Sequence, residues 1–143
     1  MKKILSLLTI ATILITSCTK NTSTPNNSSN NNNSNSTVIT GNFTITKFTD
    51  SNPNDDNAAD FSGYTFTFNA DGTIAAVNSG VTTQGSYTEK PSHEGEAAKL
   101  TISFTNAPLS DLNKSWQVDT ISDSQIFLSD DGNASEVLQF TAK

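Results

Sequence analysis

The chain has 143 residues and a formal net charge of −6, and its length suits one domain behind a short leader. It contains no arginine, and from residue 38 onward five lysines are outnumbered by all fourteen acidic residues, which leaves a net charge of −9 on that part. Binding to nucleic acid requires clustered basic residues that neutralise phosphates, so this composition excludes a nucleic-acid-binding protein. The surplus of acid also disfavours a surface that lies flat on anionic lipid.

The N-terminus has the layout of a secretory signal. Lys2 and Lys3 precede an apolar run at 4–15, and small residues follow this run up to Cys18, the only cysteine of the chain. A helix over this run spans about 18 Å, whereas the hydrocarbon core of a bilayer is roughly 30 Å thick. The run is therefore expected to be a cleaved signal and not a membrane span.

Four residues at the end of this signal resemble the lipobox of bacterial lipoproteins, namely Ile15-Thr16-Ser17-Cys18. The resemblance implies cleavage before Cys18, a diacylglycerol on its sulfur and an acyl chain such as palmitate on the new amino terminus. Two or more acyl chains hold a protein stably on a membrane. The expected organisation is a signal peptide at 1–17, a lipidated cysteine and tether at 18–37, and a folded domain at 38–143.

The tether contains no hydrophobic residue after Cys18 and consists mostly of Asn, Ser and Thr. Such a segment cannot bury enough surface to form a core, so a disordered spacer is expected. As a flexible coil, residues 19–37 reach about 24 Å from end to end. Thr19 stands where an aspartate would resemble an inner-membrane retention signal, so the expected location is the periplasmic face of the outer membrane.

Alternation of apolar and polar residues dominates the rest of the chain and predicts β-strands. In the clearest case, Tyr64, Phe66 and Phe68 face one way and the threonines between them face the other. Strands are expected at 38–48, 63–68, 73–78, 81–89 and 100–105, and around Trp116 with Val118, Ile126 with Leu128, and Leu138 with Phe140.

Several positions interrupt this alternation. Phe48 has the wrong parity for the first strand, which predicts a bulge or the end of the strand. Gly85 lies inside the fourth strand and suggests a bulge or a bend. The range 109–113 fits one helical turn, whereas 50–60 and 90–96 are polar and predict exposed loops.

About eight strands in roughly 106 residues, without a helix long enough for a parallel crossover, predict an all-β fold. We expect an antiparallel up-and-down β-barrel of about eight strands, because closure removes both exposed edges. A two-sheet β-sandwich is the alternative.

The segments 41–43, 63–73, 85–87, 115–118 and 138–140 together resemble small lipocalin-like domains attached to bacterial lipoproteins. The strand-turn-strand at 66–73 carries most of this resemblance, which covers residues 41–141. Lipocalins usually begin with Gly-x-Trp, and Phe43 stands here in place of the tryptophan. The resemblance implies a barrel and names no particular activity.

An eight-stranded barrel is just wide enough to be filled by side chains or to hold one small ligand. If it holds a ligand, the candidates for the pocket lining are Tyr64, Phe66, Phe68, Tyr87, Phe104 and Trp116. Because the sequence has several bulky aromatic residues and short strands, we expect side chains to fill the interior, and a pocket for a small apolar ligand is the open alternative. The expected protein is a monomeric, membrane-anchored, non-enzymatic envelope lipoprotein, and a small apolar ligand is one candidate for its function. The alternative is an interaction module that binds a partner protein or a glycan through its loops.

Residues suited to catalysis or metal binding are sparse. The single histidine, His93, shares a loop with one serine, and neighbours in one loop rarely supply the geometry of a catalytic triad. We therefore expect no enzyme and no cofactor. Asp55, Asp56 and Asp60 are weak candidates for binding calcium, although their loop lacks the glycine and the glutamate of an EF-hand.

Overall fold

The computed structural model describes residues 39–143 except 51, 53 and 134. The predicted signal peptide at 1–17 and the lipidated tether at 18–37, with Cys18, lie outside these residues. Among the described residues, no helix has the length and the apolar character needed to cross a bilayer.

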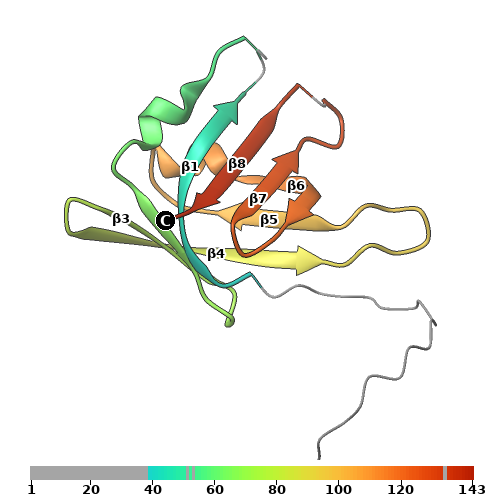
Figure 1. Cartoon of the computed structure of the whole chain (residues 1–143), viewed down its shortest axis with the longest axis horizontal. Helices are drawn as coiled ribbons and strands as arrows, with labels where there is room; N and C mark the ends of the chain where they lie inside the picture. The colour runs from blue at the N-terminus through green and yellow to red at the C-terminus, as the bar shows by residue number, and fades with distance from the viewer. Residues whose placement is uncertain (1–38, 51, 53, 134) are drawn as a thin grey trace, which may run out of the picture. The chain divides into compact units, whose positions relative to one another are not determined.

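The described residues form a closed barrel in which each strand pairs antiparallel with the next. The strands are β1 (Gly41–Thr49), β2 (Thr65–Phe68), β3 (Thr73–Asn78), β4 (Val81–Lys90), β5 (Lys99–Ser103), β6 (Lys114–Ile121), β7 (Gln125–Ser129) and β8 (Val137–Ala142). β8 pairs with β1, and Figure 1 shows these two strands side by side. The predicted up-and-down barrel is confirmed. The sandwich alternative is wrong, because β1 and β8 close the sheet on itself.

Two short 3₁₀ helices interrupt the strands, η1 (Asn57–Phe61) after β1 and η2 (Leu109–Leu112) after β5. The second confirms the helical turn expected at 109–113. The first lies in the range expected to be a polar loop. It begins where a carboxylate oxygen of Asp56 accepts a hydrogen bond from the amide of Ala58 at 3.0 Å. It ends at Phe61, whose ring packs edge-on against Phe48 with centroids 5.4 Å apart.

The two predicted irregularities have different outcomes. The register between β1 and β8 shifts between Ile45 and Lys47, so the bulge inferred from Phe48 is confirmed. This bulge turns Phe48 into the core, where it is 3% exposed. In the ladder between β3 and β4, Gly85 pairs regularly with Ile74, so the bulge at Gly85 is wrong, whereas the bend, its alternative, stays a prediction.

Alternate side chains of the strands point into the barrel and form one hydrophobic core. Its largest fully buried members are Trp116, Phe43, Phe66, Phe68, Phe140, Ile74, Leu100, Ile102, Leu109, Leu112, Ile126 and Leu128. Burying a side chain of this size contributes roughly 1.5–3 kcal/mol. Such a core can hold a small domain together without a disulfide.

Candidate functional site

The aromatic residues expected to line a ligand pocket lie in the barrel interior, with one exception. Phe66, Phe68, Tyr87, Phe104 and Trp116 are each at most 6% exposed. Tyr64 precedes β2, is half-buried and packs at a tilt against Phe66 with ring centroids 6.0 Å apart.

These rings contact one another across the interior. Phe66 packs edge-on against Phe140 at 5.4 Å and against Phe104 at 6.4 Å between centroids. Phe68 packs edge-on against Phe140 at 5.4 Å and against Tyr87 at 5.1 Å. A continuous series of edge-to-face contacts, the geometry that aromatic pairs prefer, thus runs from Tyr87 to Phe104. These ring contacts agree with the expectation that side chains fill the interior.

Trp116 is held by polar contacts in addition to its packing. Its indole N–H donates a hydrogen bond to the carbonyl of Leu112 in η2 at 3.0 Å. The ammonium of Lys114 lies 5.2 Å from the centroid of its ring, within the range of a cation–π contact. The hydrogen bond of Trp116 therefore holds η2 against β6.

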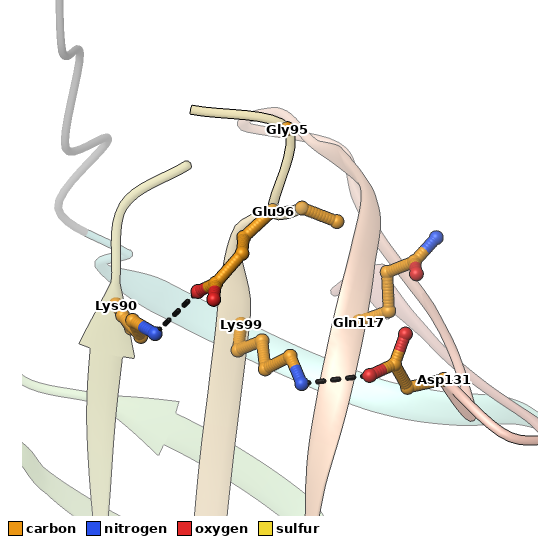
Figure 2. Close-up of a pocket in the computed structure, with 7 residues that line it drawn as sticks. Lys90, Gly95, Glu96, Lys99, Gln117 and Asp131 are labelled. Carbon is orange, nitrogen blue, oxygen red and sulfur yellow. Dashed lines mark hydrogen bonds and ion pairs between the residues drawn. The ribbon is translucent and has the colours of Figure 1, made fainter. Parts of the chain in front are cut away.

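A polar pocket of about 380 Å³ lies on the outer surface near the loop that joins β4 to β5 (Figure 2). It is lined by Lys90, Gly95, Glu96, Ala97, Lys99, Gln117 and Asp131. This set of residues is called the polar pocket below.

The geometry of the polar pocket follows from one pair in the sheet. Lys90 and Lys99 are directly opposite each other in the ladder between β4 and β5. Like charges in such a position repel, and here each lysine has its own carboxylate. Lys90 donates to Glu96 at 2.6 Å and Lys99 donates to Asp131 at 2.8 Å, as Figure 2 shows.

These hydrogen bonds stabilise the charged forms of the pocket side chains. The bond from Lys90 lowers the pKa of Glu96 below its ordinary value. The bond to Asp131 raises the pKa of Lys99. The formal charges of the two lysines and the two carboxylates in the polar pocket sum to zero. With the amide of Gln117, the polar pocket offers both donors and acceptors.

A second ionic cluster lies nearby and is less exposed. Lys114 donates hydrogen bonds to both Asp130 and Glu136. Burial lowers the pKa of Lys114, but these two bonds outweigh it and raise the pKa above its ordinary value. The cluster ties the start of β6 to the loop between β7 and β8, so its arrangement is structural.

Two of the three candidate calcium ligands, Asp55 and Asp56, accept hydrogen bonds in the structure. Asp56 accepts from the amides of Ala58 and Phe48, the latter at 3.1 Å, and Asp55 accepts from the side chain of Asn52 at 2.7 Å. Asp60 lies exposed on η1. The described part of the chain holds no group of three or more acidic, histidine or cysteine side chains placed to bind a metal. Weak calcium binding stays a prediction.

His93 lies in the exposed loop expected for it. Its imidazole is 3.9 Å from the carboxylate of Glu94, and both side chains are more than two-thirds exposed. A proton carrier in catalysis requires a fixed and shielded partner, which this arrangement does not provide.

The residues of the polar pocket were not predicted from the sequence. The pair of Lys90 and Lys99 could have been found from the expected hairpin, because a loop of eight residues joins the two strands. Asp131 is 32 positions from Lys99, and no pattern in the sequence relates them. The registers of two neighbouring ladders bring them together, because Lys99 pairs with Gln117 and Gln117 pairs with Ser129, two residues before Asp131.

The fold defines the class of this protein as a closed, eight-stranded antiparallel β-barrel. No family model matches the sequence, and no curated protein matches it. Among solved structures, the chain is similar to a DUF4847 family protein from Bacteroides vulgatus ATCC 8482. The two chains share 16% sequence identity with a TM-score of 0.49, over 75% of this chain and 95% of that one.

Proposed function

We propose that this chain is a non-enzymatic lipoprotein of the bacterial envelope, anchored by lipid on Cys18, whose barrel supports a binding surface on its loops. The observation that carries the second part is the contact of the interior rings with one another. A barrel filled in this way favours the outer surface for recognition.

The chemistry of the polar pocket favours a neutral ligand with several hydroxyl groups, such as a glycan unit. Its paired charges sum to zero, so they attract neither an anion nor a cation strongly. Carboxylates accept hydrogen bonds from hydroxyl groups, whereas ammonium groups donate to them. A volume of about 380 Å³ is within the range of small-molecule sites.

The anchor is supported by the lipobox resemblance of residues 15–18 and is tested separately from the pocket. Cells that express the chain are labelled with an alkyne analogue of palmitate and then fractionated. The wild type is expected in the membrane fraction with the label, and Cys18→Ser is expected without label and in the soluble fraction. A Cys18→Ser variant that keeps the label or stays on the membrane contradicts the anchor.

The pocket is tested by titrating neutral oligosaccharides into the purified lipoprotein in detergent micelles, with calorimetry as the readout. A variant with both Glu96→Ala and Lys99→Ala should bind at least tenfold more weakly. It should stay folded, because exposed ion pairs contribute little to stability. Lys47→Ala, an exposed lysine on β1, is the matched control and should bind like the wild type. Equal binding by all three proteins, or none, contradicts the glycan site.

Two other ligands stay predictions, and each has its own readout. A small apolar ligand would require the interior rings to move apart. It would appear as a co-purified mass in native mass spectra and as a change in Trp116 fluorescence. A partner protein at the loops would bind the wild type and lose affinity when Glu96 and Lys99 are substituted. The calorimetric titrations with oligosaccharides would then show no binding.

A further inference from the structure

Ile39 lies where the chain enters the barrel, and it is not paired in any strand ladder of the sheet. Ile39 precedes β1, which begins at Gly41, and yet it is only 2% exposed and belongs to the hydrophobic core. Thr40, between them, is exposed. Gly41 has a φ of +137°, a conformation that favours glycine and turns the chain from Ile39 into the strand.

Side chains of β4 hold the backbone of Ile39 on both sides. Its amide donates to a carboxylate oxygen of Glu89 at 3.2 Å. Its carbonyl accepts from the hydroxyl of Tyr87 at 3.1 Å, and the same hydroxyl lies 2.7 Å from the carbonyl of Asn69. One donor and one acceptor are thus directed at one residue.

The side chain of Ile39 joins an aromatic group at this end of the barrel. Tyr87 packs edge-on against Phe68 with centroids 5.1 Å apart, and Phe68 packs edge-on against Phe43 at 5.8 Å. Phe43, Phe68 and Tyr87 share the core cluster with Ile39. These residues, together with Glu89, are called the barrel mouth below.

This arrangement has the three parts that recognise an extended peptide. They are an acceptor for its N–H, a donor for its C=O and an apolar place for one side chain. If Ile39 were held by packing alone, only the apolar place for its side chain would be needed. The hydrogen bonds to Ile39 come from side chains, so the contact does not depend on continuity with β1.

We infer that the barrel mouth is a binding site for an extended peptide with an aliphatic side chain, and that Ile39 is its intramolecular occupant. The occupied site closes the barrel at the point where the chain enters it. When Ile39 is displaced, the barrel mouth accepts another extended segment with an aliphatic side chain. This site is distinct from the polar pocket and does not depend on the function proposed there.

The test displaces Ile39 from the intact lipoprotein in detergent micelles. Ile39→Asp puts a carboxylate into an apolar place beside Glu89, so the segment should leave the barrel mouth. Thr40→Asp adds the same charge at the exposed neighbour and serves as the control. The probe is a fluorescent peptide with the sequence of residues 38–41, Val-Ile-Thr-Gly, with blocked ends. Binding is followed by anisotropy.

The Ile39→Asp variant should bind the peptide saturably and at least tenfold more tightly than the wild type or Thr40→Asp. A peptide with aspartate in place of its isoleucine should not bind. A folded Ile39→Asp variant that binds no more tightly than the wild type overturns the inference. Equal binding of both peptides overturns it as well, because the aliphatic side chain would then play no part.

A second measurement applies even if Ile39→Asp fails to fold. Tyr87→Phe keeps the ring and removes the hydroxyl that donates to the carbonyl of Ile39. In this variant, hydrogen exchange at the amide of Ile39 should speed up at least tenfold more than exchange at Phe66 in β2, which follows the loss of global stability. Unchanged exchange at Ile39, or the same increase at both amides, contradicts a separately opening segment.

Discussion

A Cβ atom on Gly85 would lie 2.6 Å from two ring carbons of Phe104 and 2.6 Å from the carbonyl oxygen of Ser103. The ring of Phe104 therefore packs directly on the backbone of β4 at Gly85. A glycine is required there because the ring approaches so closely, and not because of its backbone angles. In turn, Phe104 extends the series of ring contacts through Phe66. Gly85 thus sets how closely the chain after β5 can approach β4.

Gly85→Ala should destabilise the barrel by about 1–3 kcal/mol, because overpacking forces neighbours out of their positions. Urea unfolding followed by Trp116 fluorescence measures the free energy of unfolding. Gly132→Ala is the matched control, since its new Cβ would meet only Asp130 at 3.4 Å. A Gly85→Ala protein as stable as the Gly132→Ala protein would show that the ring moves away at no cost.

Phe66→Ala should lower the free energy of unfolding by about 3–5 kcal/mol. Phe66 is 0% exposed and contacts the rings of Phe104 and Phe140, so truncation leaves a cavity at the centre of the barrel. Val81→Ala removes a side chain that is 68% exposed and should change stability by less than about 0.5 kcal/mol. An unchanged melting temperature for Phe66→Ala would contradict the inward position of this ring.

The strands were predictable from the sequence wherever alternation was regular. The expected strand at 73–78 coincides with β3, and Phe66 and Phe68 face inward as their spacing indicated. Ile39 has the same parity as Phe43 and Ile45 in the expected strand at 38–48, so its burial agrees with that alternation. Phe61 was not predictable as a core residue, because it stands outside any alternating run. What buries Phe61 is tertiary packing against Phe48.

The candidate sites were less predictable than the fold. The bulky aromatic residues of the sequence favour a filled barrel over a hollow one. They do not indicate which rings meet, such as Phe68 and Phe140 across the interior. Likewise, the ion pair between Lys99 and Asp131 depends on the registers of the two ladders that β6 makes with β5 and with β7.

Asp130 should make the protein sensitive to acid. The hydrogen bond from Lys114 lowers the pKa of Asp130, and the amide of Gly132 lowers it further. A carboxyl whose pKa is lowered by folding stabilises the protein above its unfolded pKa of about 3.9, and this stability is lost as the pH falls through the folded pKa. The free energy of unfolding should therefore fall below about pH 5.

Asp130→Asn should cost about 1–2 kcal/mol at pH 7 and flatten the acid limb of the stability curve. Asp123→Asn, at an exposed position in the turn between β6 and β7, should leave the curve unchanged. Urea midpoints between pH 3 and pH 7 give the comparison. If both variants lose stability in acid as steeply as the wild type, the contact between Lys114 and Asp130 does not contribute to the curve.

Tyr87 should make the free energy of unfolding fall at high pH, whereas Asp130 makes it fall in acid. Burial raises the pKa of its phenol, and the charges of Glu89 and Asp71 raise it further. A group whose pKa is raised by folding contributes stability that is complete below its unfolded pKa of about 10 and is lost as the pH rises through the folded pKa. Lys99 and Lys114 have raised pKa values too, so the wild-type curve alone cannot isolate Tyr87.

The difference between the wild type and Tyr87→Phe isolates the phenol. At pH 7 this variant should be less stable by about 1–3 kcal/mol, because the carbonyls of Ile39 and Asn69 lose their shared donor. Above pH 10 the gap should narrow, since only the wild type has a buried phenol that must ionise. Tyr64→Phe keeps Tyr87 and should follow the wild-type slope. A gap that stays constant from pH 8 to pH 11 would mean that the hydroxyl of Tyr87 ionises equally well in the folded and unfolded chains.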